Sequence, residues 1–369
     1  MIKIIADSKI PFLRGVFEPV AQITYLSPDK MTPEIVKEAD ALIVRTRTHC
    51  NHDLLHGSQV KMIATATIGF DHIDAAYCEE AGIRWRNAPG CNASSVAQYV
   101  LSSLLLVARD RRCTLQKLRV ALVGVGHVGK SVEKLLLQMG LEVRRCDPPR
   151  ARQEHDQTFY TLHELASWAD VFSFHTPLTR VGDDHTFHLA STAFFEALTE
   201  QPVIINTSRG EVIDEQALLQ AKEKKQVGEL IIDCWANEPV IDRALLEQAF
   251  IATPHIAGYS ADGKANATRI AAQHIADFFD LTIDLSHVIA PDIEPNQIDM
   301  RMHTEEDALL MTYDPREDMQ RLRSDMEQFE RLRGEYPLRR EYLAYSLYEA
   351  PCDELDRLKS IGFNCISTV

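Results

Sequence analysis

A glycine-rich segment of this chain has the composition and spacing of a phosphate cradle. It begins at Gly124 and reads Gly-Val-Gly-His-Val-Gly, after a short apolar run and before a helical pattern. Gly124 permits a tight turn, Gly126 lets the backbone approach a pyrophosphate, and Gly129 lets helix and strand pack closely. The helix that opens at His127 and Val128 would present its first N–H groups to the phosphate charge. The segment therefore predicts a dinucleotide site.

An acidic residue follows at the spacing that such a site requires. Asp147 ends the next apolar strand, about 20 residues after the glycines. Its carboxylate is placed to accept hydrogen bonds from the adenosine ribose hydroxyls, and its charge would repel a 2′-phosphate. NAD is therefore favoured over NADP, although Arg144, Arg145 and Arg150 lie nearby and could attract a phosphate. A purely structural glycine turn is the alternative.

Three further polar segments, each directly after a short apolar run, carry side chains capable of acid–base or anion chemistry: Arg209, Glu238 and His255. Ligands of open α/β sheets bind at the carboxyl ends of strands, so we expect these segments to meet at one edge. Singly, Arg209 could be a surface ion pair, Glu238 a solvated acid and His255 a loop histidine. Their combination beside a dinucleotide fold favours a catalytic set.

The elements that must position these residues alternate between strands and helices. Such alternation predicts an α/β fold with parallel sheets and right-handed crossovers. Asn51 is expected to cap the second helix. Apolar runs predict strands at 2–6, 41–44, 62–65, 120–123, 141–146, 203–205, 230–232 and 250–252. Helical patterns lie at 31–39, 51–57, 93–109 and 127–139.

Composition narrows the class of protein. The chain has 369 residues, 45% of them hydrophobic, and a formal net charge of −15. This acidity disfavours binding to nucleic acid or to anionic lipid. The longest apolar stretch, 99–108, is too short to span a membrane, and the first residues run directly into a strand pattern instead of a signal peptide. Eight scattered cysteines without a CxxC pair indicate reduced thiols in the cytoplasm, and no metal site is expected.

The last segment, 291–369, differs in charge but remains patterned. It holds 18 acidic and 10 basic residues. Asp314 and Pro315 predict a helix start, and an apolar stripe follows at helical spacing. We expect so small a module to bury this stripe against a second copy, as a homodimer. The stripe is Met319, Leu322, Met326 and Phe329, and the further elements are a strand at 342–348, a helix at 353–361 and a strand at 363–366.

Taken together, these motifs resemble the D-isomer-specific 2-hydroxyacid dehydrogenases. The resemblance is carried by GVGHVG, HTPLT at 175–179, INTSRGEVID at 205–214, DCWANEP and TPHIAGYS. Within that family, the chain resembles the branch that oxidises 4-phospho-D-erythronate in vitamin B6 biosynthesis. The matching segments are ATATIGFDHID, NAPGCNASSVAQYV, CDPPR, HIAGYSADGK, LRREY and GFNCI.

The resemblance implies an architecture. A Rossmann NAD-binding domain, 94–257, would be inserted into a flavodoxin-like substrate domain made of 1–93 and 258–290. Residues 291–369 would form a small C-terminal α/β dimerisation module.

The resemblance also implies roles. His255 would accept the hydroxyl proton, Glu238 would orient it, and Arg209 would bind the C1 carboxylate. Besides the glycine loop and Asp147, the cofactor would contact Thr176, Thr207, Ser208, Asp233 and Gly258. Substrate contacts would come from Arg45, Thr46, Thr67 and Tyr259.

Two alternatives remain at this point. The first is another enzyme of the family, such as a 3-phosphoglycerate or D-lactate dehydrogenase. The second is a binding protein that senses NADH on the same fold. Those sensors typically carry disordered tails, whereas this chain ends in a patterned module.

Overall fold

The computed structural model describes residues 1–156 and 158–366, apart from the side chains of residues 352 and 353. The chain divides into two compact units. The first contains residues 1–92 and 260–292, and the second contains 93–259 together with the described residues from 293 onward. The junctions fall within two residues of the expected 93 and 258. The C-terminal segment clusters with the NAD-binding region, and a separate third domain remains a prediction.

The first unit is built on a parallel sheet with the strand order β2-β1-β3-β4-β5. This is a flavodoxin-like order, as expected. Strands β3 and β4 have the predicted bounds. In contrast, β2 and β5 are partly exposed edge strands without a clear apolar run. The strands are β1 (Lys3–Asp7), β2 (Gln22–Leu26), β3 (Ala41–Val44), β4 (Met62–Thr65) and β5 (Arg84–Arg86).

Helices cover both faces of this sheet. Successive side chains of a strand point to opposite faces of the sheet. Ile43 therefore packs with α11, whereas its neighbour Leu42 packs with α1 to α3. Asn51 caps α2 as predicted, and its side chain accepts a hydrogen bond from the N–H of Leu54. The helices are α1 (Pro33–Val36), α2 (His52–Leu55), α3 (Ala75–Glu80) and α11 (Ala261–Phe279).

The second unit contains a six-stranded parallel sheet with the order β11-β10-β9-β8-β6-β7. A further parallel bridge joins Arg145 of β7 to Phe159, where a Rossmann fold has its third strand. The order reverses between β6 and β8, and that switch point is where such folds bind ligands. The strands are β6 (Arg119–Val123), β7 (Glu142–Cys146), β8 (Val171–Phe174), β9 (Val203–Asn206), β10 (Leu230–Ile232) and β11 (Ile251–Ala252).

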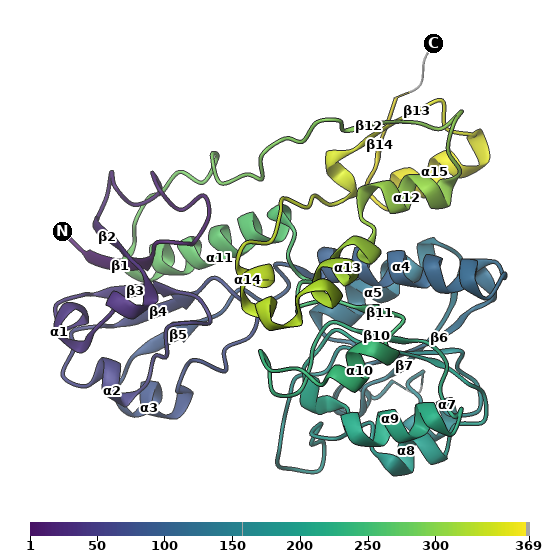
Figure 1. The fold of residues 1–369 in the computed structure, drawn as a ribbon. Helices are drawn as coiled ribbons and strands as arrows, with labels where there is room; N and C mark the ends of the chain where they lie inside the picture. Colours follow the sequence, from purple (N-terminus) through teal and green to yellow (C-terminus); the bar gives the residue numbers. More distant parts are fainter. Residues whose placement is uncertain (157, 367–369) are drawn as a thin grey trace. The chain divides into compact units, whose positions relative to one another are not determined.

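Two helical layers sandwich this sheet (Figure 1). Val120 and Leu122 face α4 and α5, whereas Ala121 and Val123 face α7 to α10. None of the described helices is both long and apolar enough to cross a bilayer. The helices are α4 (Ala93–Asp110), α5 (His127–Gln138), α6 (Pro148–Glu154), α7 (Leu162–Leu165), α8 (Thr192–Glu196), α9 (Glu215–Glu223) and α10 (Arg243–Gln248).

The C-terminal segment forms a small α/β layer, as its pattern predicted. The segment contains a three-stranded parallel sheet, with the order β12-β13-β14, together with several helices. The strand expected at 342–348 is shorter, because Tyr342–Ala344 forms a 3-10 turn. The elements are β12 (Gln297–Asp299), α12 (Glu305–Thr312), α13 (Pro315–Ser324), α14 (Phe329–Gly334), β13 (Ser346–Tyr348), α15 (Cys352–Ser360) and β14 (Asn364–Ile366).

The apolar stripe of this segment packs within its own chain. Asp314 caps α13 at the predicted helix start, but the helix ends at Ser324 and Phe329 begins a separate helix. Leu322 and Phe329 are fully buried in the core that covers one face of the six-stranded sheet. The expectation that the stripe is buried against a second copy is therefore wrong, because residues of α10 and β11 already cover it.

This packing predicts a large stability effect at Phe329. Phe329→Ala should lower the free energy of unfolding by about 3–5 kcal/mol, because it removes a fully buried ring and leaves a cavity. Urea denaturation would measure the change. The exposed Leu343→Ala serves as the control, with an expected effect within about 0.5 kcal/mol. Equal effects of the two substitutions would contradict this account of the core.

Candidate active site

The glycine loop between β6 and α5 has the geometry that its sequence predicted. Gly124 has a φ of +86°, and a Cβ there would lie 2.8 Å from Cγ2 of Thr176. A Cβ on Gly129 would lie 2.1 Å from the carbonyl oxygen of Gly124, so only glycine allows this approach. A Cβ on Gly126 would meet nothing within 4 Å. The backbone is thus tight where helix and strand meet and open where a pyrophosphate would approach.

The polar groups around this loop fit a dinucleotide. The hydroxyl of Thr176 is buried without a hydrogen-bond partner, so it has capacity for a ligand. Asp147 accepts hydrogen bonds from the backbone N–H groups of Val125, at 2.8 Å, and Arg150, at 3.1 Å, one on each carboxylate oxygen. Each oxygen keeps a lone pair for a ribose hydroxyl. His127 and Val128 form the first turn of α5, whose N-terminus favours an anion.

The three arginines near Asp147 have other partners. Arg144 stacks on Trp168, with 4.1 Å between its guanidinium carbon and the ring centroid. Arg145 lies 3.3 Å from Asp156, and the Arg150 guanidinium donates to Glu154 at 2.8 Å. These contacts leave the Asp147 carboxylate without a neutralising arginine side chain at the end of β7, which favours NAD over its 2′-phosphorylated form.

The loop after β9 carries Arg209 and is held by side-chain hydrogen bonds. Oδ1 of Asn206 accepts from the N–H and the hydroxyl of Ser208, and the Asn206 amide donates to the carbonyl oxygen of Arg209 at 3.0 Å. Gly210 allows this loop to touch the next one, since a Cβ there would lie 1.9 Å from the carbonyl carbon of Trp235. Arg209 is half-buried, and its Nη1 donates to the carbonyl oxygen of Ser208 at 2.7 Å.

Thr207 in the same loop contacts a neutral histidine. Its hydroxyl lies 3.1 Å from Nδ1 of His175, and Nε2 of that ring lies 2.9 Å from the hydroxyl of Ser173. Burial lowers the pKa of His175 to about 3. His175 therefore links the ends of β8 and β9 without carrying charge.

Asp233, at the end of β10, fastens the loop that carries His255. Its carboxylate accepts hydrogen bonds from the hydroxyl of Thr253 and the N–H of Ile256, both at 2.7 Å, and from the N–H of Ala257 at 3.0 Å. Burial raises the pKa of Asp233, although these donors and His255 favour its charged form. The carboxylate retains one unused lone pair on Oδ2, the capacity that a carboxamide contact would need.

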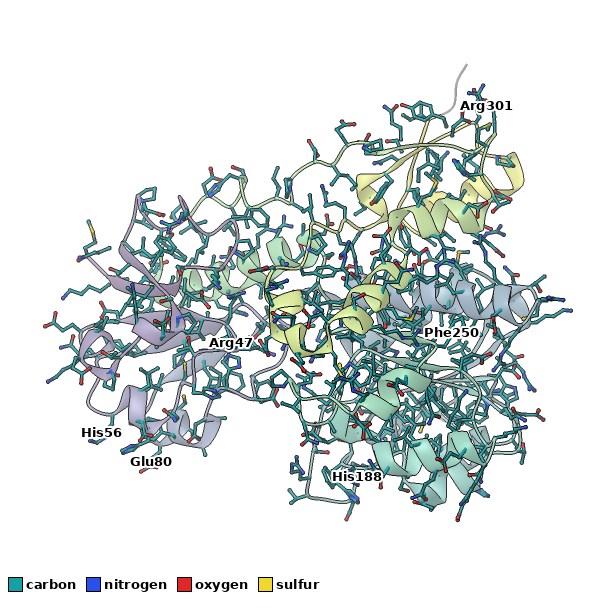
Figure 2. All side chains as sticks on the ribbon, viewed as in Figure 1. Arg47, His56, Glu80, His188, Phe250 and Arg301 are labelled. Carbon is teal, nitrogen blue, oxygen red and sulfur yellow. The ribbon has the colours of Figure 1, made fainter. Side chains whose placement is uncertain are left out.

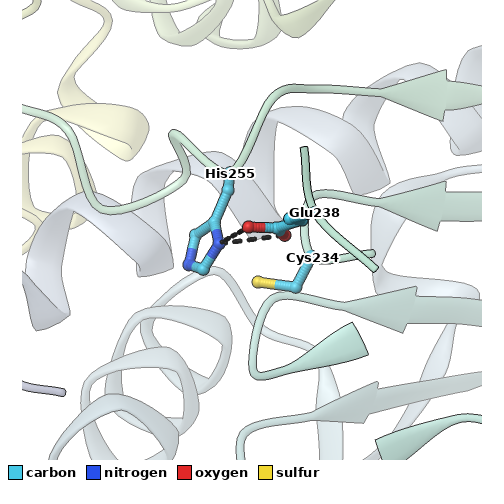
Figure 3. Close-up of side chains that lie close together, drawn as sticks. All are labelled: Cys234, Glu238 and His255. Carbon is cyan, nitrogen blue, oxygen red and sulfur yellow. Dashed lines mark hydrogen bonds and ion pairs between the residues drawn. The ribbon is translucent and has the colours of Figure 1, made fainter. Parts of the chain in front are cut away.

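His255 and Glu238 form a close pair (Figure 3). Nδ1 of His255 lies 2.8 Å from Oε2 of Glu238 and 3.0 Å from Oε1. His255 has a φ of +56°, an uncommon conformation for a residue with a side chain, and the surrounding loop maintains it. Burial opposes the charge of Glu238, but His255, the N–H of Trp235 and Arg333 outweigh it and hold the Glu238 pKa below its usual range.

The pairing determines which nitrogen of His255 can accept a proton. An ionised carboxylate can only accept hydrogen bonds, so Nδ1 must carry the hydrogen that points to Glu238. Nε2 is then the basic nitrogen of the neutral ring. The arrangement provides a general base whose protonated form is stabilised by an adjacent anion.

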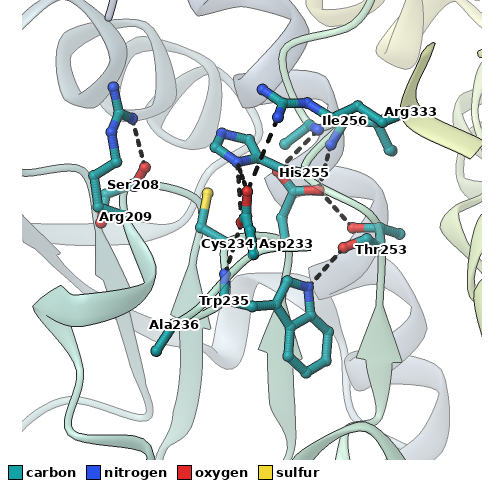
Figure 4. Close-up of polar contacts among 12 residues, drawn as sticks. Ser208, Arg209, Asp233, Cys234, Trp235, Ala236, Thr253, His255, Ile256 and Arg333 are labelled. Atoms are coloured by element: carbon teal, nitrogen blue, oxygen red, sulfur yellow. Dashed lines mark hydrogen bonds and ion pairs between the residues drawn. The ribbon is translucent and has the colours of Figure 1, made fainter. Parts of the chain in front are cut away.

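Two residues of this site were missed by the sequence reasoning. Arg333 of α14 donates from Nε to the Tyr259 hydroxyl at 3.0 Å, and its Nη1 lies 4.0 Å from Oε2 of Glu238 (Figure 4). Glu215 accepts a hydrogen bond from the N–H of Ala236 at 2.8 Å, which supports the loop before Glu238. No local pattern marks either residue, because both act through tertiary contacts distant in sequence.

The expected substrate residues fall in both units. Tyr259 and the half-buried Gly258 lie in the loop that follows His255. In the first unit, Arg45 donates to the buried carboxylate of Asp7 at 3.0 Å, and the Thr67 hydroxyl donates to the carbonyl oxygen of Gly69 at 2.8 Å. Thr46 and its neighbour Arg47 are exposed on the loop after β3 (Figure 2).

A cysteine completes one cluster of potential metal ligands among the described residues. Ligand atoms of Cys234, Glu238 and His255 lie within 4.8 Å of one another. Burial raises the pKa of the Cys234 thiol well above its usual value, so it stays protonated. Nδ1 of His255 is hydrogen-bonded to Glu238, which leaves Nε2 as its other possible ligand atom.

Comparison with known proteins identifies the class. Residues 106–257 match the family described as D-isomer specific 2-hydroxyacid dehydrogenase, NAD binding domain, which supports the NAD prediction. Residues 290–362 match a domain of unknown function, DUF3410. A cofactor-bound 3-phosphoglycerate dehydrogenase from Entamoeba histolytica has a similar structure, with a TM-score of 0.65 and 25% identity. The similarity covers 76% of this chain and 95% of that one.

Similarity to curated proteins extends over nearly the whole chain. Erythronate-4-phosphate dehydrogenase from Bacteroides thetaiotaomicron is 50% identical over 94% of this chain and 99% of its own length. The protein of that name from Porphyromonas gingivalis is 44% identical over 98% of this chain and 100% of its own length. The chain belongs to the erythronate-4-phosphate dehydrogenases, within the D-isomer-specific 2-hydroxyacid dehydrogenase family. It is an NAD-dependent oxidoreductase.

Glu215 predicts a pH-dependent stability difference. Burial, with nearby acids, raises its pKa from 4.5 to about 7. The folded state therefore retains a proton that the unfolded state loses, and stability falls as pH rises from 4.5 towards 7. Glu215→Gln should remove this loss. The urea midpoint of the variant, relative to that of wild type, should therefore increase as the pH is raised from about 5 to about 8.

The control is Glu223→Gln, which changes an exposed acid on the same helix. Its difference from wild type should not vary with pH. A pH-independent difference for Glu215→Gln would show that Glu215 does not titrate in this range.

Proposed function

We propose that this protein oxidises C2 of 4-phospho-D-erythronate with NAD, giving (R)-3-hydroxy-2-oxo-4-phosphooxybutanoate, a step of pyridoxal 5′-phosphate biosynthesis. The observation that carries the proposal is the His255–Glu238 pair, 2.8 Å apart, at the strand-end edge that also holds Arg209 and the dinucleotide loop. Its relatives at 44–50% identity carry the corresponding enzyme name.

The chemistry follows from the orientation of His255. Nε2 accepts the proton of the C2 hydroxyl while the C2 hydrogen leaves as hydride, so the C–O single bond becomes a carbonyl. NAD, when bound, supplies the hydride acceptor. The imidazolium that forms is stabilised by the Glu238 carboxylate on its Nδ1 side. Since Glu238 also fixes the ring orientation, no tautomer change precedes the step.

The remaining residues bind and orient. Arg209 holds the C1 carboxylate and polarises the forming carbonyl, for which its planar fork of donors is suited. Asp233 would accept from the nicotinamide carboxamide, and Thr176 would bond through its unpartnered hydroxyl. Thr207, Ser208 and Gly258 are proposed to contact the cofactor, and Arg45, Thr46, Thr67 and Tyr259 the substrate.

A purely NADH-sensing role is less well supported. Binding of NADH requires the glycine loop and Asp147, but it does not by itself require a carboxylate bonded to a histidine at the strand-end edge. The two roles separate in one assay, because only an enzyme produces NADH steadily from a hydroxy acid.

The substrate prediction is tested with a panel of 2-hydroxy acids, each with and without its terminal phosphate. We expect the highest kcat/KM for 4-phospho-D-erythronate, measured by NADH absorbance. Unphosphorylated erythronate should react far less well, because each donor left unpaired costs about 1–3 kcal/mol. A higher kcat/KM for D-lactate or 3-phosphoglycerate would refute the assignment and leave the dehydrogenase class intact.

The acid–base roles are tested with two substitutions. His255→Asn should lower kcat by about 10²–10⁴-fold, the usual contribution of a general base, with little change in NAD affinity. Glu238→Gln should shift the acid limb of the oxidation rate profile to lower pH, because the imidazolium loses its anionic partner. Near-normal turnover of His255→Asn would exclude its assigned role.

We also propose that the protein is a cytoplasmic homodimer that pairs through its C-terminal module. Supporting the dimer, Met311 and Leu338 are about half exposed, at 50% and 52%, beside a hollow of about 620 Å³ in that module. Supporting the location, none of the seven cysteines with described side chains forms a disulfide.

Point substitutions test the dimer better than deletion of the module. Deletion would remove Leu322 and Phe329 from the core, whereas Leu338→Asp changes only an exposed side chain. Leu338→Asp should shift sedimentation from dimer to monomer. Leu137→Asp, equally exposed on α5, is the matched control and should leave the dimer unchanged. An unchanged dimer in Leu338→Asp would place the interface elsewhere.

A further inference from the structure

The C-terminal segment contributes one cation to the site around His255. Arg333 lies in α14, and its side chain is only 19% exposed. Nε donates to the Tyr259 hydroxyl at 3.0 Å, and Nη1 lies 4.0 Å from the nearer oxygen of Glu238. The side chain therefore links a proposed substrate contact to the acid of the catalytic pair.

The guanidinium has more donors than these contacts use. Of its five N–H groups, only Nε–H forms a hydrogen bond with another described residue, because 4.0 Å is too long for one to Glu238. The two terminal nitrogens have no hydrogen bond to a described residue, but they are not fully buried. A ligand can therefore reach them. A mostly buried guanidinium with unused donors lowers the stability of the folded protein unless an anion binds to it.

Other arginines are engaged more completely. Arg339, in the same segment, donates to the backbone carbonyls of Ser95 and Ala257 and is buried. Arg45 is bonded to the buried carboxylate of Asp7. Arg209 is assigned to the C1 carboxylate. Among these arginines, Arg333 has neither a full set of partners in the described part of the chain nor an assigned ligand.

We propose that Arg333 binds the terminal phosphate of the substrate, so that the C-terminal segment determines the preference for a phosphorylated hydroxy acid. This inference rests on the proposed function. In the view of Figure 4, the Arg209 and Arg333 side chains flank His255. A substrate with an anion at each end and its reacting carbon between them matches two cations on either side of the base. The free edge of the Arg333 guanidinium can hold a phosphate by two parallel hydrogen bonds.

The test compares kcat/KM for 4-phospho-D-erythronate and for unphosphorylated D-erythronate, with saturating NAD. Arg333→Met should lower the first by roughly 10- to 100-fold for each charge-assisted hydrogen bond lost. It should lower the second by a much smaller factor, because loss of the contacts with Tyr259 and Glu238 affects both substrates alike. Arg333→Lys should fall between Met and wild type, because it keeps the charge but loses the fork. The control is Arg331→Met, on the same helix but 62% exposed, which should leave both values unchanged.

A second measurement does not depend on turnover. Inorganic phosphate, titrated calorimetrically into the full-length protein with NAD, should bind wild type more tightly than Arg333→Met. An equal fall of kcat/KM for both substrates would show that Arg333 only positions Tyr259 and Glu238, and would overturn the inference. Failure of the proposed function differs from this, because wild type itself would then show no preference for the phosphorylated acid. If Arg333→Met fails to fold, the same comparisons in Arg333→Lys decide the question.

Discussion

The hydrogen bond between Nδ1 of His255 and the Glu238 carboxylate is the interaction on which the site depends. The two residues come from different strand-end loops, so the bond forms only if both loops are held in register. Asp233 holds one loop through three hydrogen bonds, and Trp235 and Glu215 hold the other. Gly210 permits the Arg209 loop to pack directly on that second loop. A parallel sheet explains this convergence, because all its strands end at the same edge.

The C-terminal segment belongs to the same physical unit as the NAD-binding sheet. Leu322 and Phe329 complete the core on one face of that sheet, and Gln98 of α4 donates to Thr312 and to the Arg340 carbonyl oxygen of the segment. Arg333 of the same segment donates a hydrogen bond to Tyr259, in the loop that follows His255. The acidic composition of this segment suggests an accessory module. The structure shows instead that it supplies core residues, buried polar contacts and a cation close to the His255–Glu238 pair.

Much of this arrangement could be predicted from sequence, because the signals were local. β3, β4 and β10 have the predicted bounds since they are continuous apolar runs, and the glycine loop is specified by contacts that only glycine tolerates. The edge strands β2 and β5 lack such runs and were missed. Arg333 and Glu215 were missed because tertiary contacts alone define them. The stripe of Leu322 and Phe329 was recognised correctly as apolar, but periodicity does not reveal which surface covers it.

We propose that Glu238 fixes the tautomer of His255 and leaves Nε2 as the base. The most direct measurement is nitrogen-15 NMR of the labelled imidazole in the wild-type protein, at a pH where the ring is neutral. Because the Glu238 carboxylate can only accept a hydrogen bond, we expect a proton on Nδ1 and a bare Nε2. A proton on Nε2, with Nδ1 bare, would contradict it, because Nε2 could not then accept the hydroxyl proton.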